Sequence, residues 1–71
     1  MKKIEHIGET IRNCRKDAGL TQPQLAKLIG VTHSAISLWE NNINIPNVLA
    51  CWLIADQLKI SIDELVGRSD G

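Results

Sequence analysis

The 71-residue sequence contains no phenylalanine and no tyrosine, and Trp39 and Trp52 are its only aromatic residues. A hydrophobic core must therefore be built from aliphatic side chains, and so short a chain indicates one domain, residues 1–71. The longest apolar run, Val48 to Ala55, is too short to span a membrane. Because the charged residues at the N-terminus lead into no apolar signal segment, we expect a cytoplasmic protein.

The residue types that carry most enzyme and metal chemistry are also scarce. Two cysteines, Cys14 and Cys51, make neither a disulfide framework nor a zinc finger, and both lie at apolar helical positions. We therefore expect two buried, free thiols. No nucleophile and base are paired, and no glycine-rich phosphate loop is present. The sequence thus predicts a protein that is not an enzyme, with no metal, no cofactor and no small-molecule ligand.

The chain has no excess of charge of either sign, since eight basic residues balance eight acidic ones. Their distribution is uneven: residues 1–30 have a net charge of +3 and residues 31–71 a net charge of −3. This asymmetry is compatible with an anion-binding face and equally with a mixed, solvated surface.

Apolar residues recur at helical spacing, and no segment alternates long enough for a strand. In the first segment the repeating residues are Ile4, Ile7, Ile11 and Cys14. We expect an all-α domain with five short helices around one core, at about residues 5–18, 21–29, 33–41 and 48–58, with a short fifth helix after Ser61.

Capping residues support these bounds. Thr21 and Gln24 form a capping-box pattern with Pro23 in the first turn, and Gly30 ends that helix. The next three helices are expected to be capped by Thr32, Asn47 and Ser61. The buried stripe expected for the second helix consists of Leu25, Leu28 and Ile29, and that of the fourth of Val48, Cys51, Ile54, Ala55 and Leu58.

The segment from Gln22 to Trp39, QPQLAKLIGVTHSAISLW, contains two short helices joined at Gly30-Val31-Thr32. A small residue at Ala26 allows close approach of the two helices, while Ile36 and Trp39 anchor the second one to the core. This is the pattern of a helix-turn-helix, about residues 21–41, whose second helix lies in the DNA major groove.

Nearly the whole chain resembles the Cro/repressor-type, lambda-repressor-like helix-turn-helix domains of temperate phages and bacterial regulators. The residues that carry the resemblance are Arg15, Gly19-Leu20-Thr21-Gln22, Leu25-Ala26, Gly30-Val31, Ile36-Ser37, Trp39-Glu40-Asn41, Pro46, Ile54-Ala55, Leu58 and Ser61-Ile62-Asp63-Glu64-Leu65. The resemblance implies a partly buried ion pair between Arg15 and Glu40. Relatives usually place a glycine and basic residues after the Trp-Glu pair, where this chain has Asn42-Ile43-Asn44-Ile45. We expect Asn42 to replace the glycine. We expect part of the missing charge to come from Arg12, Lys27, Lys2 and Lys3.

Together with side-chain chemistry, the resemblance implies the residues that meet DNA. Those expected to face base edges are His33, Ser34, Ala35, Ser37 and Leu38. Those expected to hold phosphates are Gln22, Thr32, Asn41, Asn44 and Arg12. Partial packing remains an alternative for Leu38.

The fourth helix has more apolar residues than one buried stripe requires. Leu49, Trp52 and Leu53 form a second stripe, for which we expect pairing with a second copy of the chain. The alternative is that Trp52 folds back onto the C-terminal helix.

These features predict a sequence-specific operator-binding repressor of phage Cro type that acts as a homodimer in the bacterial cytoplasm. Its expected partners are double-stranded DNA and itself. The alternatives are a helical protein-interaction module and the N-terminal DNA-binding domain of a larger repressor. Activators of the family that the chain resembles carry acidic residues on the second helix, where they touch polymerase. Because Thr21 to Ile29 contain no acidic residue, the resemblance implies repression by promoter occlusion.

Overall fold

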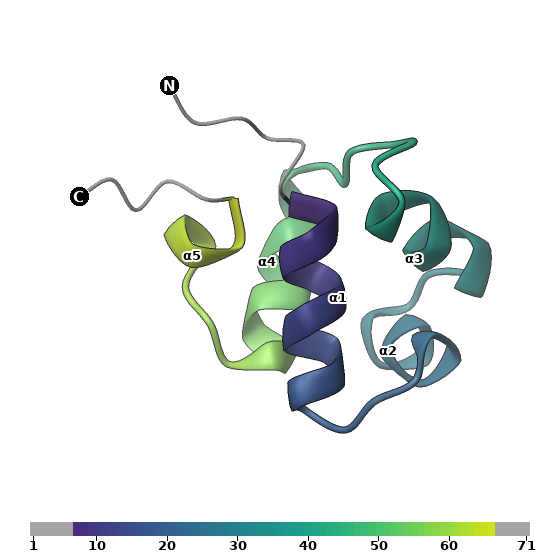
Figure 1. Ribbon diagram of the computed structural model, residues 1–71, viewed down its shortest axis with the longest axis horizontal. Coiled ribbons are helices and arrows are strands. Elements are labelled where there is room, and N and C mark those ends of the chain that lie inside the picture. The colour runs from purple at the N-terminus through teal and green to yellow at the C-terminus, as the bar shows by residue number, and fades with distance from the viewer. Residues whose placement is uncertain (1–6, 67–71) are drawn as a thin grey trace.

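The computed structural model of the protein describes residues 7–66, which form five α-helices without a strand, as predicted. The helices are α1 (Ile7–Asp17), α2 (Gln22–Ile29), α3 (His33–Glu40), α4 (Val48–Leu58) and α5 (Ile62–Val66). In Figure 1, α2 and α3 lie on one side of α1, and α5 lies on the other. Helix α1 packs against α3, α4 and α5, and α2 packs against α3 and α4. The start of the predicted first helix lies outside the described residues, as do Lys2, Lys3 and Ile4.

The predicted caps are present. Thr21 Oγ1 accepts from the N–H of Gln24, whose side chain accepts from the N–H of Thr21, completing the capping box. Thr32 caps α3 by accepting from the N–H of Ala35, and Asn47 caps α4 by accepting from the N–H of Ala50. Ser61 Oγ accepts from the N–H of Glu64. These bonds satisfy backbone donors that a helix N-terminus leaves without a partner.

The core is aliphatic apart from Trp39. Its five most completely enclosed large side chains come from all five helices: Ile11, Leu25, Ile36, Ile54 and Leu65. Cys51 is buried and Cys14 is half-buried, so the expectation for Cys14 is only partly met, and both thiols are free. Burial raises the pKa of both cysteines, which keeps the thiols protonated and unreactive.

Two residues predicted to be buried are exposed. Leu28 is 50% exposed because the inward face of α2 is formed by Leu25, Ala26 and Ile29, and the small Ala26 admits α3. Val48 is 74% exposed, because the inward side of the first turn of α4 is formed by Ala50 and Cys51. Pro46 and Ala50 are buried at that end of the helix instead.

Within residues 7–66, no helix is long and apolar enough to cross a membrane.

Candidate nucleic-acid interface

Helices α2 and α3 form the predicted helix-turn-helix. Gly30 ends α2 in the left-handed conformation with φ of 77°, and its N–H and that of Val31 both donate to the carbonyl oxygen of Ala26. Only glycine adopts this conformation without strain from a Cβ atom. Thr32 then begins α3, so three residues turn the chain from one helix to the next. Buried Ile36 and Trp39 hold α3 against the core and leave its opposite face exposed.

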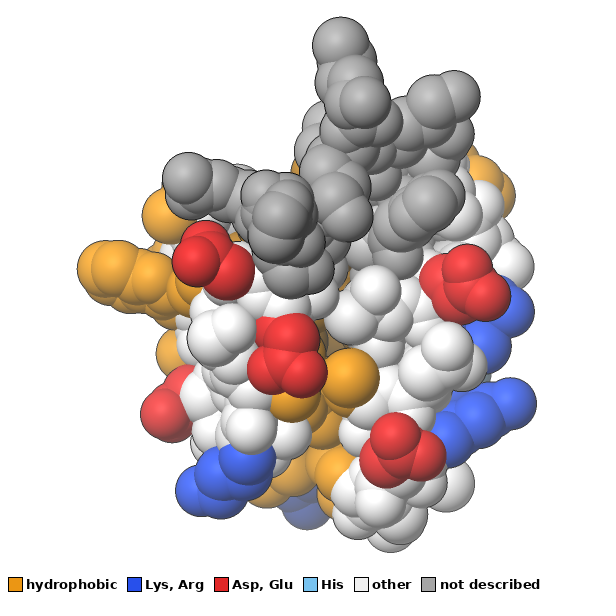
Figure 2. Space-filling model, turned by 60° about the vertical axis from the view of Figure 1, so that its left-hand side comes forward, with side chains coloured by type: hydrophobic (Ala, Val, Ile, Leu, Met, Phe, Trp, Pro, Cys, Tyr) orange, Lys and Arg blue, Asp and Glu red, His pale blue; other side chains and the backbone are white. Residues whose placement is uncertain are grey.

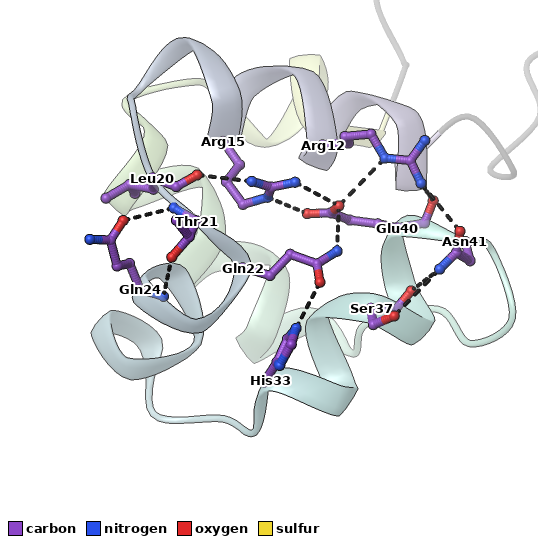
Figure 3. A network of polar contacts seen from close by, with 10 residues as sticks. All are labelled: Arg12, Arg15, Leu20, Thr21, Gln22, Gln24, His33, Ser37, Glu40 and Asn41. Atoms are coloured by element: carbon purple, nitrogen blue, oxygen red, sulfur yellow. Dashed lines mark hydrogen bonds and ion pairs between the residues drawn. The ribbon is translucent and has the colours of Figure 1, made fainter.

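The ion pair between Arg15 and Glu40 connects α1 to the end of α3 (Figure 3). Arg15 Nε lies 2.6 Å from Glu40 Oε2 and Arg15 Nη2 lies 3.1 Å from Oε1, a bidentate arrangement. The side chain of Glu40 is fully buried and that of Arg15 is 10% exposed. Arg15 Nη1 also donates to the carbonyl oxygen of Leu20 at 2.8 Å. The contact expected from the resemblance is therefore formed, and it orients α3.

The Glu40 carboxylate has two further side-chain partners, Gln22 and Arg12. Burial alone raises the pKa of its carboxyl, but the side-chain hydrogen bonds from Arg15, Gln22 and Arg12, together with the positive charge of Arg15, outweigh burial and lower that pKa. Arg12 Nε lies 3.5 Å from Glu40 Oε1. The carboxyl is therefore ionised at neutral pH and acts only as an acceptor.

Gln22 connects this buried carboxylate to the start of α3. Its Nε2 donates to Glu40 Oε1 at 2.9 Å, and its Oε1 lies 2.8 Å from His33 Nε2. Figure 3 shows the Gln22 side chain between the two. A residue expected to be a phosphate contact is thus half-buried and also positions an expected base-reading residue.

Arg12 and Asn41, both expected to contact phosphate, are bonded to each other. Arg12 Nη2 donates to Asn41 Oδ1 at 3.2 Å and to the carbonyl oxygen of Glu40 at 3.3 Å. Asn41 Nδ2 donates to the carbonyl oxygen of Ser37 at 2.9 Å. These bonds cap the C-terminus of α3, and the Arg12 side chain is 39% exposed.

The expected base-reading residues lie on the outward side of α3. His33 and Ser34 are exposed, while Ala35, Ser37 and Leu38 are half-buried. The partial packing of Leu38 agrees with the alternative left open for it. Thr32 and Asn44, expected at phosphates, are exposed on either side of α3, and Asn42 has the left-handed φ of 60° that was expected. The surface of α3 thus bears short polar groups and no exposed acidic side chain.

A separate apolar surface lies on α4. Leu49 and Trp52 are each 62% exposed and Leu53 is 37% exposed, so Trp52 does not fold back into the core. Val48 extends this α4 stripe at one end of the helix. On the face shown in Figure 2, acidic and basic side chains are scattered, and hydrophobic side chains project at the left margin.

The sequence did not predict the contacts of Gln22 with Glu40 and His33, nor those of Arg12 with Glu40 and Asn41. Each joins different helices, and local patterns carry no signal for such pairs. Within residues 7–66, no group of three His, Cys, Asp or Glu residues could hold a metal ion.

The helix-turn-helix family matches residues 11–65 of this chain. The transcriptional repressor RstR of the cryptic phage CTXphi in Vibrio cholerae is 40% identical over 62 residues, covering 87% of this chain and 55% of that protein. The transcriptional activator BcrR of Enterococcus faecalis is 36% identical over 64 residues, covering 90% of this chain and 31% of that protein. The chain therefore spans about half or less of the length of these curated relatives.

Two solved structures of repressors resemble this chain in fold. The P22 c2 repressor in complex with the synthetic operator 9T matches with a TM-score of 0.81 and 37% identity, covering 84% of this chain and 91% of that one. The solution structure of the DNA-binding domain of the P22 c2 repressor matches with a TM-score of 0.80 and 35% identity, covering 90% and 86%. This chain belongs to the Cro/repressor-type helix-turn-helix family.

Proposed function

We propose that the chain is the sequence-specific DNA-binding part of a transcriptional repressor, and that it inserts α3 into the major groove of an operator. The observation that carries the proposal is the outward face of α3, which is held in place by the buried Arg15–Glu40 pair. That face bears short polar side chains and no exposed acid, so it fits a groove lined by base edges and phosphates. The match to an operator-bound repressor supports this placement.

The proposed base-reading residues lie along this face, beginning with exposed His33 and Ser34. Histidine and serine hydrogen-bond to base edges, and Ala35 or Leu38 can meet a thymine methyl group. Asn41 Nδ2 donates to the carbonyl oxygen of Ser37 at 2.9 Å and to its hydroxyl oxygen at 3.4 Å, so the Ser37 hydroxyl would meet a base as a donor. None of these residues makes the bidentate arginine–guanine contact, so each should discriminate by at most about 1–3 kcal/mol.

The proposed phosphate contacts surround α3. The backbone at the start of α2 presents N–H groups to an anion, and Gln22 retains a second amide hydrogen beyond the one given to Glu40. Thr32, Asn44 and Asn41 are neutral, so we propose a shallow salt dependence of binding. Arg12 would add one positively charged contact to a phosphate, because its Nη1 makes no hydrogen bond within residues 7–66 and can donate to a phosphate oxygen.

We further propose that two copies pair through the α4 stripe of Leu49, Trp52 and Leu53. Burial of the stripe would remove an exposed apolar surface from water and place an aromatic residue at the centre of a two-fold interface. Such a pair would set two α3 helices about 34 Å apart, the spacing of successive major grooves on one side of DNA.

This domain also fits the N-terminal part of a larger repressor, because the chain spans only 55% of RstR. A Cro-type repressor and a larger repressor would use the same DNA-binding site on α3. They would differ in the residues outside the segment that matches RstR, and the Cro-type proposal is that of a short chain acting alone.

Selection of bound sequences from random DNA tests the proposal. We expect one enriched motif with two half-sites about one helical turn apart. The double variant His33→Ala/Ser34→Ala should change the enriched bases. Gln22→Ala should weaken binding to the operator and to random DNA alike, since the Gln22 side chain is a proposed phosphate contact. Absence of any enriched motif would contradict sequence-specific binding and favour a protein-interaction module.

A further inference from the structure

The hydrogen bonds from Glu40 to His33 run in one direction only. The Glu40 carboxylate accepts from Arg15 and from Gln22, and a carboxylate cannot donate. The Gln22 amide therefore turns its NH₂ group toward Glu40. Its carbonyl oxygen then faces outward, 2.8 Å from His33 Nε2.

This direction assigns the tautomer of His33. Because the Gln22 carbonyl oxygen is an acceptor, the ring nitrogen that meets it must carry the proton, so neutral His33 is in its Nε2–H form. The other nitrogen, Nδ1, is then an acceptor, and it makes no hydrogen bond within residues 7–66. A side chain that could either donate or accept is thus restricted to one role by a buried carboxylate on the same helix.

We propose that His33 recognises the amino bases, adenine and cytosine, by accepting a hydrogen bond from the base at Nδ1. This inference rests on the proposed function, which places the start of α3 in the major groove. Adenine and cytosine present an exocyclic NH₂ group there, while guanine and thymine present oxygen acceptors. An unprotonated Nδ1 would face those oxygens with no hydrogen between them.

The test uses the selection experiment at about pH 8. The base read by His33 is the position whose preference disappears in His33→Ala. The parent protein should prefer adenine or cytosine there by about five- to tenfold over guanine or thymine. Ser34→Ala serves as the matched control, and it should retain the preference at this position.

A base analogue and a spectroscopic measurement make the test independent of selection. If adenine is preferred, replacing it with purine, which lacks the amino group, should weaken the parent five- to tenfold at about pH 8 and leave His33→Ala unaffected. Nitrogen NMR of the imidazole in the free protein should place the proton on Nε2.

A preference for guanine or thymine at about pH 8, no change in any base preference in His33→Ala, or a proton on Nδ1 would overturn this inference alone. If no sequence at all is enriched, the proposed function fails together with it.

Discussion

The backbone N–H of Gly8 donates to Asn42 Oδ1 at 3.2 Å and joins the first turn of α1 to the segment that leaves α3. A Cβ atom at position 8 would lie 2.6 Å from that oxygen and 2.8 Å from the carbonyl oxygen of Glu40, and it would also collide with the carbonyl oxygen of Trp39. Two of these three atoms belong to the backbone and cannot rotate away. The contact therefore requires a residue without a side chain.

We expect Gly8→Ala to destabilise the fold. At an exposed helical site alanine is more stable than glycine by about 1 kcal/mol, but here displacement of the α3 end should outweigh this gain and cost about 1–3 kcal/mol net. Urea denaturation measures the difference. Asn13→Ala, at an exposed position of α1, is the control and should remain near the parent. A Gly8→Ala variant as stable as the parent would show that the contact can relax.

Removal of either partner of the buried ion pair should be costly. Arg15→Met leaves the fully buried Glu40 carboxylate short of its bidentate partner, which should reduce the free energy of unfolding by about 3–5 kcal/mol. The double variant Arg15→Met/Glu40→Leu should lose less than the sum of the two single variants, because neither buried charge remains. Lys16→Ala, beside Arg15 but exposed, is the control. Additive losses in this double-mutant cycle would argue against direct coupling.

Acid should unfold the protein through Glu40. The pKa of this carboxyl is lowered in the folded state from its ordinary value of 4.5. Its contribution to stability is therefore fully present above pH 4.5 and is lost as the pH falls through the lower, folded-state pKa. The free energy of unfolding should decline as the pH falls through this range. In Glu40→Gln the decline should be smaller, and an unchanged decline would assign acid unfolding to other carboxyls.

Pairing through α4 should depend on its exposed apolar side chains. Trp52→Ala/Leu53→Ala should weaken dimerisation in sedimentation equilibrium by at least tenfold, because Trp52 is the largest group in the stripe. Gln57→Ala, also exposed on α4, is the control and should dimerise like the parent. If the double variant remains as dimeric as the parent, the interface lies elsewhere, in α5 or beyond Leu65.

The exposed surface of α2 predicts the direction of regulation. It bears Lys27 as its only charged side chain, so it offers no acidic contact to polymerase. In a purified transcription system we expect repression of a promoter that overlaps the operator. The variant His33→Ala/Ser34→Ala should relieve this repression at the parent operator. Stimulation of an adjacent promoter would contradict the prediction, and the activator BcrR among the relatives makes the measurement informative.

The sequence by itself determined the helices, their ends and the helix-turn-helix. Caps such as Thr21 and Asn47 act within four residues, and Gly30 meets a purely local backbone requirement. The spacing of Ile36 and Trp39 likewise follows from the helical period, so the exposed face of α3 could be predicted without the fold.

The tertiary structure decided what the helical period leaves open. Periodicity shows that a helix has an apolar side, but neighbouring helices decide which residues at its edge are covered, and for this reason Leu28 and Val48 are exposed. The bond between Gln22 and His33 joins two helices across eleven positions. Its direction is imposed by Glu40, so the tautomer that His33 presents follows from a buried charge that only the folded arrangement of α1, α2 and α3 brings into contact.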